Sequence, residues 1–179
     1  MNIFATSKPM IGIVTAALAV LGGMAVYAQD KYELKSPGGI ALSDFRGYED
    51  WAVVSSARTD EVLKVIVASP IMMAAFRAGV PGNGQPFPDG SMIAKLQWKP
   101  KKSTEAPFAV EVPDVFTQAF LMEKDSKRFP DSGGWGYALF NYEAASDTFK
   151  ADPSPSNCGH SCHMAVKTKD YIFHPYQKR

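Results

Sequence analysis

The sequence predicts an α+β domain, built on a mainly antiparallel β-sheet of about five strands with two or three helices. Several short segments alternate apolar and polar residues, as half-buried strands do. Stretches rich in Gly and Pro, such as residues 80–90, separate these segments. The segments with a helical pattern are short, and a C-terminal helix is expected to carry both cysteines.

Residues 1–28 have the pattern of a cleaved export signal. Lys8 gives a positive start, and residues 10–26 form an apolar run broken only by Gly and Thr, with small residues before the cleavage point. An uncleaved membrane anchor is the alternative, although this run is short for a span of ~20 residues. We therefore expect a periplasmic protein with no membrane association after cleavage. Its single domain, residues 29–179, begins with an extended lead-in over residues 29–41.

Local signals place the elements that follow. Ser43 is suited to cap a short helix over residues 44–51. Ser69 offers a second capping hydroxyl, Pro70 suits the first position of a helix, and Gly79 suits its end. The strands are expected at residues 53–57, 62–67, 91–99, 115–125 and 135–142.

The charge balance excludes some functions. Without Lys8 the exported chain has 18 basic and 18 acidic residues, so it has no basic surface of the kind that nucleic-acid binding needs. Hydrophobic residues make up 46% of the sequence, which is enough for a core that does not depend on disulfides. The two cysteines are therefore available for another purpose.

Both cysteines and two of the three histidines lie in one short segment, "NCGHSCHMAV", residues 157–166. In haem attachment, two thiols add to the vinyl groups of the haem, and the histidine after the second cysteine binds the iron. Cys158, Cys162 and His163 meet this pattern, except that their spacer has three residues instead of two. Gly159 can accommodate the longer spacer. The segment predicts a covalently bound haem c with His163 as the iron ligand.

Three alternatives use the same residues. Cys158 and Cys162 could form a disulfide, as is common in exported proteins. With His160 and His163 they could bind zinc, although four ligands in one turn is unlike the usual spacing. A redox dithiol normally has two residues between its cysteines. In the haem interpretation, His160 is expected to face solvent.

The position of the motif limits the type of cytochrome. Only sixteen residues follow His163, too few for the helical cytochromes that bind a later methionine. A four-helix haem bundle would need four long amphipathic segments, and this sequence has short strands instead. A haem protein based on a β-sheet remains, with a final helix expected to run from the motif to Pro175.

Five blocks between about Phe45 and Phe173 carry a family resemblance: "FRGYEDW", "PFPDGSMIAKLQWK", "FLMEKDSKRF", "SGGWGYALF" and "CHMAVKTKDYIF". They resemble the cytochrome P-460 family, to which the beta-type cytochromes c′ belong. The resemblance implies a mainly antiparallel β fold, one covalent c-type haem, five-coordinate iron and usually a homodimer.

The same resemblance implies two kinds of function. Catalytic members carry a lysine cross-linked to the haem and oxidise hydroxylamine, with nitric oxide chemistry at the iron and a distal carboxylate as proton relay. Lys95 matches the lysine, and Glu111 or Glu123 lies in the region of the carboxylate. Relatives without the cross-link bind nitric oxide or carbon monoxide. The expected partners are a small nitrogen-oxide or diatomic ligand and a periplasmic electron-transfer protein.

Ordinary structural roles remain open for several of these residues. Lys95 shares its strand face with Gln97 and Lys99, as a solvated face would. Four phenylalanines could line the distal pocket or fill the core, namely Phe76, Phe87, Phe116 and Phe120. Four methionines could fill the core or supply a sixth ligand in a simple electron carrier, namely Met72, Met73, Met92 and Met122.

Overall fold

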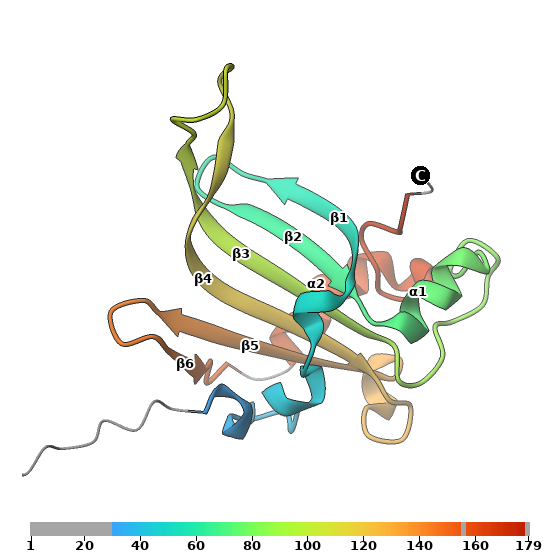
Figure 1. The fold of residues 1–179 in the computed structure, drawn as a ribbon. Coiled ribbons are helices and arrows are strands. Elements are labelled where there is room, and N and C mark those ends of the chain that lie inside the picture. Colours follow the sequence, from blue (N-terminus) through green and yellow to red (C-terminus); the bar gives the residue numbers. More distant parts are fainter. Residues whose placement is uncertain (1–29, 155–156, 178–179) are drawn as a thin grey trace, which may run out of the picture.

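The computed structural model describes residues 30–154 and 157–177; the predicted export signal lies outside this range. Its centre is a six-stranded antiparallel sheet in which every strand pairs with the next one along the chain (Figure 1). This arrangement confirms the predicted α+β class. The strands are β1 (Ala52–Arg58), β2 (Leu63–Ala68), β3 (Met92–Lys102), β4 (Glu111–Lys124), β5 (Trp135–Glu143) and β6 (Thr148–Ala151).

Helices are few and short. Helix α1 (Pro70–Arg77) begins as predicted, because the Ser69 hydroxyl accepts a hydrogen bond from the Met72 amide and Pro70 occupies the first position. Helix α2 (Asn157–His163) carries the cysteine segment and continues into the 3₁₀ helix η5 (Met164–Lys169). Among the described residues, no helix is long and apolar enough to cross a membrane. The other 3₁₀ helices are η1 (Lys31–Glu33), η2 (Leu42–Phe45), η3 (Tyr48–Asp50) and η4 (Pro130–Ser132).

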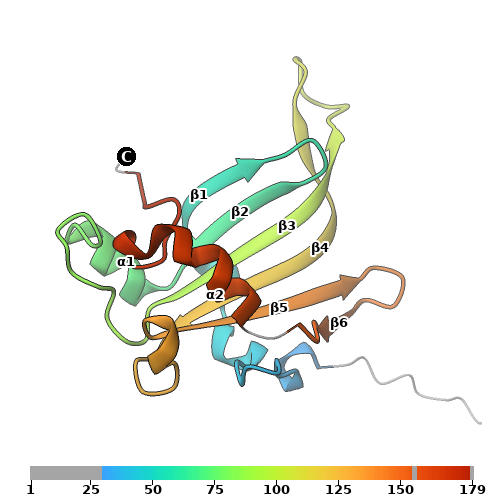
Figure 2. The same ribbon diagram turned by 180° about the vertical axis from the view of Figure 1, so that it is seen from behind.

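The two faces of the sheet are covered differently. The N-terminal segment with η1 to η3 lies over one face, and α2 crosses the other (Figures 1 and 2). Alternate residues of each strand supply the two cores, as the two-residue period of a strand requires. One core joins Phe45 and Leu42 to Ala94 and Leu121, and the other joins α1 to Trp135 and its neighbours.

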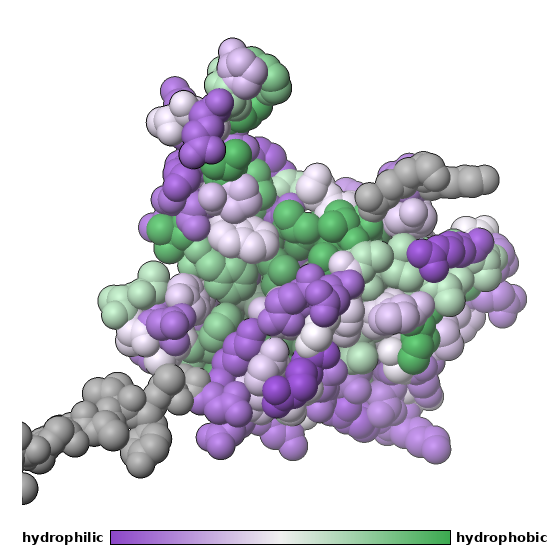
Figure 3. Space-filling view, viewed as in Figure 1, coloured by the Kyte–Doolittle hydropathy of each residue, from purple (hydrophilic) through white to green (hydrophobic). Residues whose placement is uncertain are grey.

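The face covered by the N-terminal segment keeps an apolar area at its surface. Figure 3 shows this area as green spheres over the upper part of the sheet. Half-buried residues on this face include Val65, Leu96 and Phe116, and the Phe116 ring contacts the Trp98 ring edge to face at 5.2 Å. The space for a ligand lies on the opposite face, under α2.

Three predicted elements differ in the structure. Residues 148–151 form β6, a strand beyond the five predicted from the sequence, because Thr148 to Ala151 pair with the outer edge of β5. The short helix over 44–51 is replaced by η2 and η3, since Gly47 between them adopts a left-handed φ of 85°. The final helix does not reach Pro175: Val166 has non-helical angles, and η5 ends at residue 169.

Candidate haem-binding site

His163 ends α2 and has a fixed ring orientation. Its Nδ1 lies 2.6 Å from the carbonyl oxygen of Tyr171. Because a carbonyl only accepts hydrogen bonds, Nδ1 carries the proton, and Nε2 keeps its lone pair for a metal. Burial lowers the pKa of His163, which favours the neutral ring that binds metals.

Aromatic rings enclose the histidines of α2. The His163 ring lies 5.2 Å from Tyr137 and contacts Phe173 edge to face at 4.8 Å. His160 does not face solvent as expected: its ring packs 5.4 Å from Tyr171 and 6.0 Å from Tyr137. Tight packing of α2 on β5 causes this arrangement, since the helix turn that carries His160 lies directly on Tyr137.

The two cysteines differ in what the structure describes. Cys162 is exposed on α2 and lines the space between this helix and the sheet. Cys158 belongs to the same helix, but its side chain lies outside the described part of the structure. The two positions are four residues apart in the sequence, about one turn of helix. Cys158 therefore lies near the start of α2, and Cys162 lies near its end, directly before His163.

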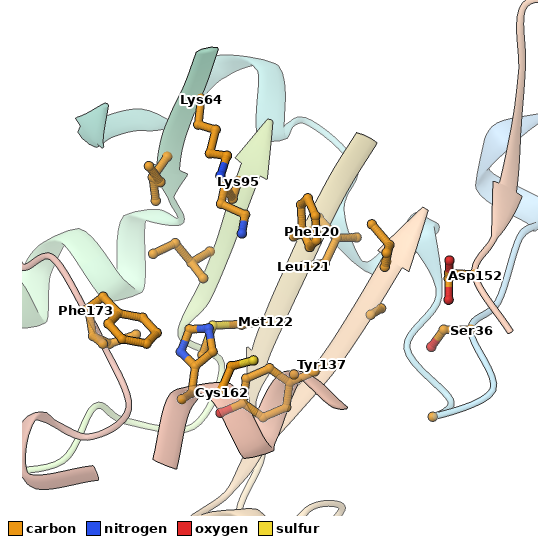
Figure 4. A pocket seen from close by; sticks show the side chains of 18 of the residues that line it. Ser36, Lys64, Lys95, Phe120, Leu121, Met122, Tyr137, Asp152, Cys162 and Phe173 are labelled. Atoms are coloured by element: carbon orange, nitrogen blue, oxygen red, sulfur yellow. The ribbon is translucent and has the colours of Figure 1, made fainter. Parts of the chain in front are cut away.

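A cavity of about 520 Å³ separates α2 from the sheet (Figure 4). Strand register arranges its floor in rows of direct cross-strand neighbours. The row under α2 is apolar and consists of Ile93, Met122 and Tyr137. The middle row mixes one lysine with apolar residues, namely Ile66, Lys95, Phe120 and Leu139. The next row is polar and consists of Lys64, Gln97, Gln118 and Asn141, of which Lys64 alone lines the cavity.

The polar row forms a hydrogen-bonded ladder. Gln97 Nε2 donates to Gln118 Oε1 at 3.0 Å, and Gln118 Nε2 donates to Asn141 Oδ1 at 2.7 Å. Asn141 Nδ2 then donates to Asp152 Oδ2 at 3.0 Å. Asp152 is the only carboxylate among the described residues that line the cavity. Polarity therefore increases from the His163 end of the cavity toward this edge.

Lys95 lines the cavity and is not part of a solvated face. Its Nζ lies 3.8 Å from the centre of the Phe120 ring, a cation–π contact across neighbouring strands. Burial lowers the pKa of Lys95, and the nearby charge of Lys64 lowers it further. Lys64 extends into the same space from β2 (Figure 4). Sequence reasoning did not single out Lys64, although the pairing of β2 with β3 would have placed it one row from Lys95.

The structure does not bring Glu111 or Glu123 to the cavity. Glu111 pairs with Arg58 at the far end of the sheet. Glu123 Oε2 accepts from Arg128 Nη1 at 2.7 Å, and burial raises the pKa of this carboxyl. Both side chains are therefore neutralised by arginines away from His163.

Of the candidate phenylalanines, only Phe120 lines the cavity. Phe76 and Phe87 pack together in the core beneath α1, with ring centres 4.9 Å apart. Phe116 lies on the opposite face of the sheet. Among the methionines that the structure describes, Met122 alone reaches the cavity lining.

The residues present fit a covalently attached haem. The cavity volume lies within the ~300–1,000 Å³ of typical ligand pockets, and its walls are mainly apolar. Gly159 allows α2 to lie directly on β5, because a Cβ there would come within 2.7 Å of Tyr137 Cβ. The Tyr137 hydroxyl is buried without a hydrogen-bond partner in the described structure, so a polar group of a bound cofactor would satisfy it.

Comparison with known proteins agrees with this assignment. No curated protein matches the sequence. The model of the cytochrome P460 family matches residues 45–174, which include the whole sheet, most of the residues that line the cavity, and the cysteine segment. The chain therefore belongs to the cytochrome P460 family, a family of haem proteins.

Proposed function

We propose that this protein carries one haem c, attached through Cys158 and Cys162, with His163 as the proximal ligand of the iron. The haem would supply an iron atom with one open coordination position. The chain holds His163 as a neutral donor through the Tyr171 carbonyl. The rows of the sheet floor provide the opposite wall of the cavity.

The best-supported ligand is a small diatomic molecule, nitric oxide or carbon monoxide. The observation that carries this proposal is the middle row of the floor, where Ile66, Phe120 and Leu139 offer apolar contacts. Apolar walls favour uncharged ligands because burying an unpaired charge is costly. The described lining contains no glutamate that could take up protons from a reacting ligand.

A second candidate is oxidation of hydroxylamine or nitric oxide, with electrons passed to a periplasmic cytochrome. The lysines in the cavity favour it, since a lysine bonded to the haem is a feature of the catalytic relatives. Lys95 is the residue that sequence similarity indicates, and Lys64 is equally inside the lining. Peptide mapping of the mature protein tests both: recovery of each lysine in an unmodified peptide would exclude the cross-link.

A simple electron carrier needs a sixth ligand on the side of the iron opposite His163. Met122 is the only described methionine in the lining, and it is the cross-strand neighbour of Tyr137, whose ring contacts His163. This position places Met122 beside the proximal histidine. We therefore expect five-coordinate iron.

Export, cleavage of residues 1–28, a periplasmic location and a homodimer complete the proposal. Cell fractionation with N-terminal sequencing of the mature protein tests the first three. Retention of residues 1–28 in a membrane fraction would show that the segment is an anchor. Light scattering of the purified protein tests the dimer.

Optical spectra of the protein, matured with haem c and measured oxidised, reduced and under each gas, test the main proposal. We expect a high-spin ferrous spectrum that nitric oxide and carbon monoxide change. A strongly red-shifted reduced Soret band would indicate a modified macrocycle and favour the enzyme. A low-spin six-coordinate spectrum that neither gas changes would refute gas binding.

Variants of the attachment segment test the site itself. Cys158→Ala and Cys162→Ala should each leave the haem on a single thioether, and His163→Ala should remove the proximal ligand. Phe116→Tyr is the matched control, since Phe116 packs on the opposite face of the sheet and does not line the cavity. Wild-type spectra in all three attachment variants would refute the assignment.

A further inference from the structure

Two left-handed residues follow η5 and turn the chain toward its end. Asp170 has a φ of 47° and Tyr171 a φ of 66°, and neither is glycine. Residues with a Cβ are strained in this region, so consecutive examples require contacts that hold them. The contacts at Asp170 supply this restraint.

The Asp170 carboxylate accepts hydrogen bonds from three separate parts of the chain. Lys124 Nζ on β4 lies 2.8 Å and 3.0 Å from its two oxygens. Trp135 Nε1 on β5 donates at 3.2 Å, and the Phe87 amide donates at 2.7 Å. Lys124 also donates to the Gly133 carbonyl at 2.8 Å. The Lys124–Asp170 ion pair is therefore held by hydrogen bonds to Trp135 on β5, to Gly133 just before β5, and to Phe87 before β3.

This ion pair is buried. The side chains of Lys124 and Asp170 are 7% and 10% exposed, and Trp135 is fully buried against them. In such surroundings each charge depends on the other, and moving one would leave the partner uncompensated. Asp170 therefore has little freedom to shift.

The next residue connects the ion pair to the site. The carbonyl of Tyr171 accepts the Nδ1 proton of His163 at 2.6 Å. Such a hydrogen bond fixes the ring of a metal-binding histidine and makes its other nitrogen a stronger donor. The ring of Tyr171 is also fixed, because it lies so close to Gly133 that a Cβ there would be 2.3 Å from Tyr171 Cε2.

We propose that Asp170, held by Lys124, is a positioning residue for His163. By fixing the Tyr171 carbonyl, the buried ion pair sets the orientation and donor strength of the imidazole toward the haem iron. This inference rests on the proposed function, in which His163 binds iron. It adds two residues that lie outside the attachment motif, one on β4 and one after η5.

Asp170→Asn in the haem-loaded full-length protein tests the inference. Asparagine keeps the size of the side chain but removes the charge that Lys124 compensates. We expect the iron–histidine stretching band of the ferrous protein, measured by resonance Raman, to broaden and move to lower frequency. The haem reduction potential should rise, because a weaker hydrogen bond at Nδ1 makes His163 a poorer donor to the ferric iron.

Phe87→Leu is the matched control. The Phe87 ring packs against Trp135 at 6.1 Å in the same core, while its backbone amide would still donate to Asp170. This variant should lower the unfolding midpoint and leave the band in place. An unchanged band in Asp170→Asn, or an equal shift in both variants, would overturn the inference.

Two further results separate this inference from the proposed function. A wild-type protein without any iron–histidine band would overturn ligation by His163 itself. If Asp170→Asn does not fold, Trp135→Phe replaces it, since it removes only one donor to the carboxylate. A smaller band shift in the same direction is then expected, and no shift would overturn the inference.

Discussion

Two opposite effects on stability are expected when Gly159 in α2 is replaced with alanine. Helix propensity alone favours alanine over glycine by ~1 kcal/mol. The structure predicts a loss of stability instead, because the new Cβ would lie 2.7 Å from Tyr137 Cβ and 2.8 Å from its Cγ and Cδ1. Tyr137 Cβ is fixed to β5, an inner strand between β4 and β6, so the helix has to move. Overpacking of this kind costs ~1–3 kcal/mol, which leaves a net loss of up to ~2 kcal/mol.

Urea unfolding and the ratio of haem to protein absorbance measure this effect. We expect Gly159→Ala to unfold at lower urea and to bind less haem, because lifting α2 moves Cys162 and His163 together. Gly82→Ala is the matched control: its Cβ would meet nothing nearer than the Gly79 carbonyl oxygen at 3.3 Å, and neither residue lines the cavity. If Gly159→Ala were as stable as the wild type and fully loaded, the close approach of α2 to β5 would be refuted.

Three further predictions concern the cavity and its surroundings. Burial lowers the pKa of Lys95 below its usual 10.5. At pH values below this lowered pKa, the buried charge of Lys95 reduces the free energy of unfolding. This destabilisation disappears as the pH rises toward 10.5. In protein whose Lys95 is unmodified, Lys95→Met should therefore raise the urea midpoint at neutral pH, and this rise should be smaller in alkaline solution. A rise of the same size at every pH would contradict this reasoning. Phe120→Ala removes an apolar wall of the cavity, and stopped-flow mixing should show faster entry of carbon monoxide, whereas an unchanged rate would place the entry path elsewhere. Glu111→Gln and Glu123→Gln should leave gas affinity unchanged, since neither side chain lines the cavity; a large change in titrations of either variant would show a role at the iron.

The sequence was most informative where local chemistry decides the structure. The start of α1 needed only Ser69 and Pro70, whose capping roles depend on neighbours a few residues away. The alternation of apolar and polar residues located five of the six strands. The fold class followed from these patterns and agrees with the structure. The family was indicated by the resemblance of five sequence blocks, and the family match agrees with it.

Longer-range contacts explain what the sequence did not predict. β6 has only four residues, and it forms because its backbone pairs with β5. Lys64 entered no site prediction, because only the register between β2 and β3 places it beside the cavity. Asp170 resembles an ordinary surface carboxylate until Lys124, 46 residues earlier in the chain, is found beside it.

The register of the strands also explains which side chains face the cavity. Ile66, Lys95 and Phe120 are direct cross-strand neighbours, so they point to the same face of the sheet. A slip of one residue in β3 would turn Lys95 to the opposite face, where Ala94 and Leu121 lie in the other core. Burying a lysine there would be costly, so that core fixes the register. Residues of the opposite core therefore determine which residues line the cavity.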